Sequence, residues 1–153
     1  MSATMARSAR KVPRILIIGG GYVGLNTAIQ IRKRMGRREA AIVVVDPRPY
    51  MTYQPFLPEA AAGSLEPRHV VAPHRRLLRG TTVLTGRLAG LDHAGRKARI
   101  TPMEGEEYTV SYDHVVLGFG SVARVLPIPG LAEQGIGFKQ IEEAIALRNL
   151  VLG

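Results

Sequence analysis

The stretch RILIIGGGYVG, residues 14–24, decides the fold of this chain. Its first five residues form an almost uninterrupted apolar run with several β-branched side chains, which is the composition of a strand buried on both faces. The three glycines that follow predict a sharp turn directly after the strand. A helical pattern then runs from about Tyr22 to Met35, with apolar or small side chains every four residues: Val23, Thr27, Ile31 and Met35, with Ala28 beside them.

A second buried strand is expected after this helix. Residues 41–45 read AIVVV, and the run ends at Asp46. The last turn of the helix holds three cations (residues 32–34), whose charges suit the negative end of the helix dipole, and Gly36 can end the helix. Strand, helix and strand together occupy about 30 residues, so the two strands should be parallel neighbours.

The glycines form the pattern Gly19-x-Gly21-x-x-Gly24, and Asp46 follows 22 residues after the last of them. Gly19 permits a tight turn, Gly21 lets the backbone approach a pyrophosphate at the helix N-terminus, and Gly24 lets the helix pack closely on the strand. The Asp46 carboxylate can accept hydrogen bonds from a ribose diol. The combination predicts a dinucleotide site, with a glycine turn in an ordinary βαβ unit as the alternative. It does not choose between NAD and FAD.

The remaining elements are expected from local patterns. Four prolines within residues 47–58 predict an irregular loop, followed by one helical turn at 57–62. Pro67 is well placed in the first turn of a helix running to about Arg79. A strand is expected at 82–87, then short strands at 88–91, 97–102 and 108–111 as a small antiparallel meander, then a buried strand at 114–119 and a last helix from near Gln140. We therefore expect an α/β, Rossmann-like FAD/NAD(P)-binding fold with a parallel sheet and an inserted β-meander.

Composition excludes several classes of protein. The 153 residues include no cysteine, so this chain has no disulfide, Cys-ligated metal or thiol nucleophile. No run of 18 apolar residues predicts a membrane span, and no apolar segment suggests a secretory signal. The four histidines lack paired-ligand spacing, so no metal site is expected, and Ser121 lacks the GxSxG elbow of hydrolases. We expect a cytoplasmic protein whose residues 1–12 form a basic flexible tail.

Charge is unevenly distributed along the chain. Residues 1–80 hold 14 Lys/Arg and 4 Asp/Glu (net +10), whereas residues 81–153 hold 7 and 8 (net −1). Such asymmetry can indicate nucleic acid, an anionic membrane surface or a phosphate-bearing cofactor. The basic runs at 7–14 and 32–38 contain no aromatic residue, which nucleic-acid modules usually place beside their cations. We favour a solvated tail and helix end, and we expect no nucleic-acid partner.

Three further segments carry a resemblance. The segment YDHVVLGFGS, residues 112–121, together with Gly19–Gly24 and Asp46, resembles the FAD domain of flavoproteins with two dinucleotide-binding domains. The segments YMTYQPFLPEAAAG (50–63) and LPIPG (126–130) are similar to the type II NADH dehydrogenase branch of the pyridine nucleotide-disulfide oxidoreductase superfamily. The likeness covers about residues 13–152.

This resemblance implies FAD as the cofactor, hydride transfer from NADH to the flavin, and electron transfer to a quinone at a membrane surface. It implies no catalytic acid or base, because the flavin supplies the redox chemistry. The resemblance also implies which positions contact FAD. Those near the pyrophosphate and ribose are Gly19, Gly20, Gly21, Tyr22, Val23, Gly24 and Asp46, and those near the adenosine are Pro47, Arg48, Arg87 and Leu88. Gln54 and Pro55 would lie near the isoalloxazine, and Gly120 and Ser121 would close over the cofactor.

The chain also departs from the pattern of that family. Phe119 stands where the family usually has a hydroxyl-bearing residue, and no second GxGxxG follows. We therefore expect a partial FAD-binding domain at residues 13–139 and, at 140–153, the start of a helix leading to an NADH domain outside this chain. Its apolar sheet and helix surface should be partly exposed.

These departures leave three functional hypotheses. The first is the FAD portion of an NADH:quinone oxidoreductase, inactive alone and peripheral at the inner face of the cell membrane in its full-length form. The second is a truncated module that binds a dinucleotide without catalysis. The third is a basic binder of nucleic acid or a membrane surface.

Overall fold

The computed structural model describes residues 12–152 and confirms the central strand–helix–strand unit. Strand β1 (Arg14–Ile18), helix α1 (Tyr22–Arg34) and strand β2 (Ala41–Asp46) follow one another as expected. β1 and β2 pair in parallel, with Arg14 opposite Ala41 and Ile18 opposite Val45. Every residue of β2 from Ile42 to Val45 is buried, which explains its uninterrupted apolar sequence.

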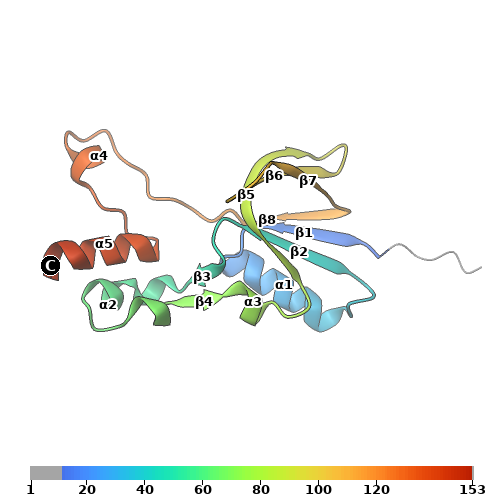
Figure 1. Cartoon of the computed structure of the whole chain (residues 1–153), viewed down its shortest axis with the longest axis horizontal. Helices are drawn as coiled ribbons and strands as arrows, with labels where there is room; N and C mark the ends of the chain where they lie inside the picture. The colour runs from blue at the N-terminus through green and yellow to red at the C-terminus, as the bar shows by residue number, and fades with distance from the viewer. Residues whose placement is uncertain (1–11, 153) are drawn as a thin grey trace, which may run out of the picture.

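Six strands form one curled sheet in the order β7-β6-β5-β2-β1-β8 (Figure 1). β8 (His114–Leu117) pairs in parallel with β1, and β5 (Thr82–Asp92) pairs in parallel with β2 through its first residues. The far half of β5 leaves this pairing and forms the antiparallel meander with β6 (Lys97–Pro102) and β7 (Tyr108–Ser111). The α/β fold and its inserted meander are therefore confirmed. β5 is one strand with a register shift between Leu88 and Gly90, where two short strands were expected.

Side chains of the parallel strands alternate between two hydrophobic clusters. On one face, Leu16 and Ile18 pack with Val43 and Val45 against residues of the curled meander, including Ile100. On the other face, the sheet is covered by α1 and by Leu78, which follows α3 (His74–Leu77). The buried residues of this cluster are Ile17, Leu25, Ala28, Ile42, Val44, Met51 and Leu78. The period of two along each strand thus separates the meander side from the helix side.

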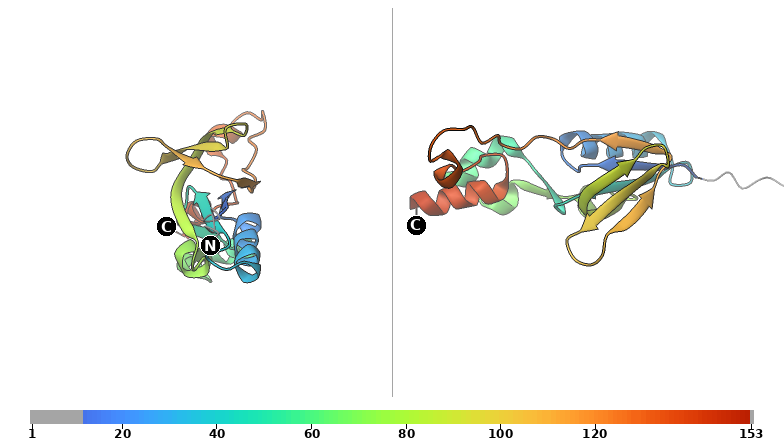
Figure 2. Two further views of the ribbon diagram at one scale, coloured as in Figure 1. Left: turned by 90° about the vertical axis from the view of Figure 1, so that its right-hand side faces the viewer. Right: turned by 90° about the horizontal axis from the view of Figure 1, so that it is seen from above.

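A second, smaller layer extends beyond the carboxyl ends of the parallel strands (Figures 1 and 2). It contains a two-stranded antiparallel sheet, β3 (Tyr50–Thr52) and β4 (Val71–Pro73), with helices α2 (Leu57–Ala61) and α5 (Ile141–Leu152). Leu57, Ala60, Val70, Ile141 and Ala144 form its core. α5, at the end of the described chain, therefore packs against α2, which lies about 80 residues earlier in the sequence.

Two local expectations were wrong. The loop expected at 47–58 contains β3 and a 3-10 turn (Gln54–Phe56), because pairing with β4 orders it. The helix expected at 67–79 is divided into a 3-10 turn (Pro67–His69), strand β4 and helix α3. Pro73 disfavours helical backbone at the residue before it and cannot donate to a helix, so the chain stays extended until His74.

The buried face of α1 also differs from the expected stripe. Gly24, Leu25 and Ala28 face the sheet, whereas the Val23 side chain is 60% exposed. The smallest side chains lie against the strands because the helix approaches them closely there. Periodicity alone had favoured the bulkier row of Val23, Thr27 and Ile31.

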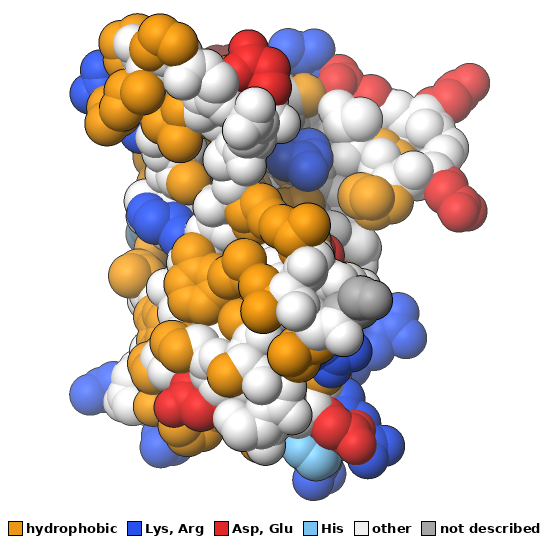
Figure 3. All heavy atoms as spheres, turned by 90° about the vertical axis from the view of Figure 1, so that its left-hand side faces the viewer, with side chains coloured by type: hydrophobic (Ala, Val, Ile, Leu, Met, Phe, Trp, Pro, Cys, Tyr) orange, Lys and Arg blue, Asp and Glu red, His pale blue; other side chains and the backbone are white. Residues whose placement is uncertain are grey.

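Apolar surface is exposed on this chain, as the sequence predicted. Side chains of this kind gather over the end of the molecule formed by α2, α4 (Leu131–Gln134) and α5 (Figure 3). Leu150, Val151 and Leu152 of α5 are each at least 65% exposed. Within residues 12–152, no helix is both long and apolar enough to cross a bilayer. The basic tail expected at 1–12 lies almost wholly outside the described residues, as does Gly153.

Candidate dinucleotide site

Two glycines hold the turn between β1 and α1 in its shape. Gly19 has φ of 100°, and a Cβ added to it would overlap the carbonyl oxygen of Gly118 at the end of β8. A Cβ on Gly24 would overlap the Gly19 carbonyl oxygen. The first turn of α1 therefore lies directly against the glycine turn, and only residues without a side chain allow this approach.

Asp46 reaches back from the end of β2 to the glycine turn. Its Oδ2 accepts a hydrogen bond from the Gly20 N–H at 2.6 Å, and its Oδ1 accepts one from the Arg48 N–H at 2.8 Å. A carboxylate can accept about four hydrogen bonds, so lone pairs remain for a ribose diol. The carboxyl ends of β1, β2 and β8 meet at this edge, where open α/β sheets bind ligands.

The positive end of the α1 helix dipole, at its N-terminus, is not compensated by an acidic or capping side chain. Gly21 caps the helix without a side-chain hydrogen bond, and the first turn contains no acid. Within the described chain, the N–H groups of Gly21, Tyr22 and Val23 donate to no backbone or side-chain acceptor. A Cβ on Gly21 would meet nothing within 4 Å. Unpaired donors, an uncompensated dipole and open space together suit an anion such as a pyrophosphate.

Gln54, Lys139 and Ser121 meet beyond the glycine turn, although they come from three separate segments. Lys139 Nζ donates to Ser121 Oγ at 2.7 Å, and Gln54 Nε2 donates to the Lys139 carbonyl at 3.1 Å. Gly120 beside Ser121 has φ of 69°, which favours glycine at this bend. The tertiary structure therefore joins Gln54, expected near the isoalloxazine, to Ser121 of the expected closing segment, with Pro55 exposed in the same 3-10 turn as Gln54.

Arg48 and Tyr50 both contact Glu142 at the start of α5. Tyr50 donates to Glu142 Oε1 at 2.6 Å, and Arg48 Nε lies 3.3 Å from the same atom. Burial and the Glu142 hydrogen bond raise the pKa of Tyr50 above its ordinary 10.0. Burial opposes ionisation of Glu142, but hydrogen bonds from Tyr50, the backbone and Arg48 outweigh it and lower the Glu142 pKa below 4.5. These contacts fasten α5 to the segment that follows Asp46.

We expect the attachment of α5 to weaken in acid. Because the folded state lowers the Glu142 pKa, its contribution is complete above pH 4.5 and is lost as pH falls through the lowered value. Hydrogen exchange of α5 amides, measured from about pH 6 to pH 3, should show this loss. Glu142→Gln should flatten the dependence, whereas Glu133→Gln on exposed α4 should leave it unchanged. Equal acid sensitivity in wild type and Glu142→Gln would contradict the assignment.

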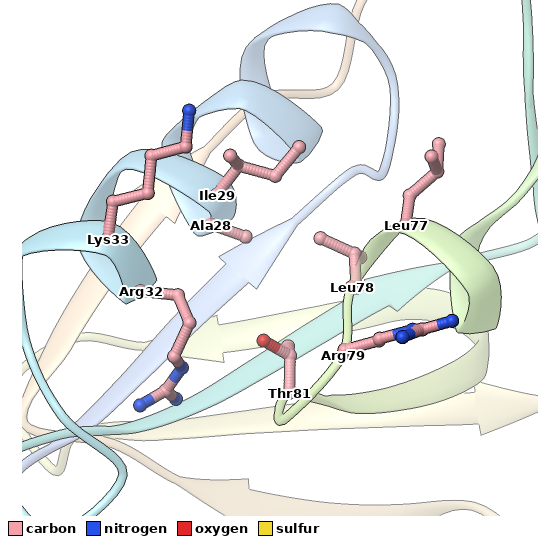
Figure 4. Close-up of a pocket in the computed structure, with 8 residues that line it drawn as sticks. All are labelled: Ala28, Ile29, Arg32, Lys33, Leu77, Leu78, Arg79 and Thr81. Atoms are coloured by element: carbon pink, nitrogen blue, oxygen red, sulfur yellow. The ribbon is translucent and has the colours of Figure 1, made fainter.

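The last two expected positions lie further along β5. Asp46 is opposite Thr85, and Arg87 and Leu88 follow where the strand turns to pair with β6. They therefore lie on the strand that pairs with β2 at Asp46, two and three residues past that pairing. A separate cavity of about 190 Å³ lies between α1 and α3 (Figure 4), with cations around an apolar floor: Ala28, Ile29, Arg32, Lys33, Leu77, Leu78, Arg79 and Thr81. It is on the flank of α1, away from its N-terminus.

Three residues at this site were not predicted from sequence patterns. Lys139 and Glu142 contact expected cofactor residues, as described above, and His74 hydrogen-bonds the glycine turn through Gly20. Each contact joins positions far apart in the chain, so no local spacing could have identified it.

Comparison with known proteins agrees with this geometry. The model of the pyridine nucleotide-disulphide oxidoreductase family matches residues 8–152. The chain is 26% identical to the mitochondrial external alternative NAD(P)H-ubiquinone oxidoreductase B2 of Arabidopsis thaliana, covering 97% of this chain and 26% of that protein. It is 29% identical to the type II NADH:quinone oxidoreductase Ndh of Mycobacterium tuberculosis, covering 91% of this chain and 30% of that one.

A solved structure shows the same fold. NDH2 from Plasmodium falciparum in complex with NADH superimposes with a TM-score of 0.81 at 20% identity, covering 90% of this chain and 28% of the solved one. The chain thus spans about a quarter to a third of the length of these relatives. The family consists of flavoproteins that bind FAD, with NADH as substrate. Because the family model matches nearly the whole sequence, the chain belongs to the pyridine nucleotide-disulphide oxidoreductase family.

Proposed function

We propose that this chain binds FAD as the cofactor-binding portion of an NAD(P)H:quinone oxidoreductase. One observation carries the proposal: the glycine turn, the unpaired N–H groups of α1 and the Asp46 carboxylate form one connected unit at the edge of the sheet. Membership of a flavoprotein family and relatives named as NADH and NAD(P)H quinone oxidoreductases support it.

The residues of this site match the successive parts of the FAD molecule. The N–H groups of Gly21, Tyr22 and Val23 would hold the pyrophosphate, and Asp46 would accept from the adenosine ribose. The Asp46 charge disfavours a 2′-phosphate at this position. Arg48 lies beside the adenosine end, and β5 at Arg87 and Leu88 offers backbone groups to the adenine. When bound, FAD supplies the hydride-accepting and electron-transferring ring, while the protein positions it and tunes its electrostatics.

Gln54, Pro55, Gly120 and Ser121 form the opposite end of the proposed FAD site. Lys139 holds Ser121 and Gln54 together, so these segments are already placed side by side. Because Phe119 has no hydroxyl and is 63% exposed, contact at this position would come from backbone groups. Chemistry at the flavin ring would thus rely on positioning by these residues, with no acid or base among them.

The whole enzyme's activity requires more than these residues. No second glycine fingerprint for NADH occurs in this sequence. We propose that residues 13–139 supply FAD-binding elements, that α5 leads toward the NADH-binding part in a protein of the relatives' length, and that quinone reduction takes place at a membrane surface. The isolated chain is then expected to bind FAD without oxidising NADH, as a non-catalytic module.

The direct test is to titrate the purified chain with FAD and to follow bound-flavin fluorescence and visible absorbance. Saturable binding with one FAD per chain is expected, together with no NADH consumption by the FAD-loaded chain. Absence of any FAD or ADP binding by folded protein would overturn the proposal.

Asp46→Ala should weaken FAD binding by roughly 10- to 100-fold, because charge-assisted hydrogen bonds to the ribose are lost and the Gly20 N–H loses its acceptor. Asp92→Ala is the matched control: Asp92 also accepts a backbone N–H, from Gly95 at 2.8 Å, but lies in the meander turn. Fluorescence titration should show unchanged affinity for the control. Equal affinities of both variants would contradict the ribose assignment.

A further inference from the structure

His74 is a buried titratable residue that the proposed site does not yet use. It begins α3, its side chain is 0% exposed, and its Nε2 lies 2.8 Å from the Gly20 carbonyl oxygen. Gly20 is itself buried, and a Cβ added there would overlap the imidazole ring. The ring therefore packs directly against the middle residue of the glycine turn.

The contact determines which ring nitrogen carries the proton. A carbonyl oxygen only accepts, so Nε2 must be an N–H donor, and in the neutral imidazole Nδ1 then holds the lone pair. Nδ1 is buried and has no hydrogen-bond partner among the described residues. A buried polar atom without a partner opposes folding. His74 thus retains one satisfied donor, directed at Gly20, at the expense of an unsatisfied acceptor.

The direction of the Gly20 carbonyl sets the direction of the next N–H. A trans peptide is planar, so the Gly20 C=O and the Gly21 N–H point in opposite directions. With the carbonyl turned inward to His74, the Gly21 N–H points away from the ring, and it donates to no acceptor in the described part of the chain. The preceding peptide is held as well, because the Gly20 N–H donates to Asp46.

Without such a restraint this turn would have alternatives. Gly20 and Gly21 have no side chains, and glycine adopts backbone conformations on both sides of the φ map. Rotation of the peptide between them would turn a carbonyl oxygen toward the anion site and the N–H away from it. A carbonyl facing a pyrophosphate repels it, so only one orientation of this peptide is competent to bind.

We propose that His74 is a positioning residue for the dinucleotide pyrophosphate: its Nε2–H holds the Gly20 carbonyl inward and so keeps the Gly21 N–H directed at the phosphate oxygens. The inference rests on the proposed FAD site and adds to it a residue that does not itself touch the ligand. His74 acts through Gly20 alone, from a helix that follows the second, smaller sheet.

Two substitutions separate the donor from the bulk of the ring. His74→Gln can place an amide N–H near the position of Nε2, whereas His74→Leu fills similar space without a donor. If the competent orientation falls to about a tenth of the population in His74→Leu, the apparent Kd for FAD rises about tenfold, and His74→Gln should stay within about threefold of wild type. Urea unfolding of each variant shows which of them remain folded. Wild-type affinity in folded His74→Leu, or equal losses in both variants, would overturn the inference.

A measurement on the ligand-free wild type gives a second, independent answer. Imidazole ¹⁵N shifts should show the Nε2–H tautomer, and the Gly21 amide should exchange with solvent faster than the Gly20 amide, which Asp46 protects. An Nδ1–H tautomer would overturn the inference even if every variant failed to fold. If wild type showed the expected tautomer but bound no FAD, the proposed function would fail, and with it the ligand assigned here.

Discussion

Gly21→Val is expected to abolish FAD binding while leaving the fold intact. Gly21 has φ of −71° and ψ of −160°, an extended conformation that valine adopts readily. A Cβ there meets no protein atom within 4 Å, so the side chain would project into the space proposed for the pyrophosphate. Losing several charge-assisted hydrogen bonds should weaken FAD binding by about 100-fold or more, measured by fluorescence titration.

Gly36→Val is the matched control for this substitution. Gly36 lies just beyond the opposite end of α1, and a Cβ there would meet only the flexible Glu39 carboxylate at 3.3 Å. FAD affinity should be unchanged in this variant, and both variants should unfold near the wild-type temperature. Retained binding in Gly21→Val would exclude the pyrophosphate from the N-terminus of α1.

Gly24→Ala, three residues further on, should have the opposite effect and destabilise the fold. Helix propensity alone would make alanine more stable by about 1 kcal/mol. The added Cβ, however, would overlap the Gly19 carbonyl oxygen, a backbone atom that cannot move without displacing β1 or α1. Overpacking of this kind costs about 3 kcal/mol, so the steric effect outweighs propensity.

Urea unfolding followed by circular dichroism measures this loss. Asn26→Ala, at an exposed position of the same helix, should change the free energy of unfolding by only about 0.5 kcal/mol or less. Unchanged stability in Gly24→Ala would show that α1 can move away from β1 at small cost. The two variants together thus distinguish a glycine that is needed for ligand binding, Gly21, from a glycine that is needed for the packing of α1 on β1, Gly24.

Much of the fold could be predicted because its signals are local. Residues 14–24 and Asp46 predicted β1, α1 and β2, and short alternating runs predicted the meander. The predictions were wrong where a second local feature opposed the one on which they relied. Pro67 favoured a helix, but Pro73 kept the following segment extended, and the regular row beginning at Val23 concealed the smaller residues that face the sheet.

The glycine turn and its acid were recognisable from spacing because each step of that unit involves neighbouring elements. The contacts that complete the candidate site are of another kind. His74 meets Gly20 across 54 residues, Gln54 meets the Lys139 carbonyl across 85, and Arg48 meets Glu142 across 94. Periodicity and spacing record which face of an element is buried, whereas a hydrogen bond between distant segments depends on how whole elements pack. The pattern of a dinucleotide site could therefore be recognised in the sequence, whereas the contacts that His74, Lys139 and Glu142 make with its residues depend on the tertiary structure.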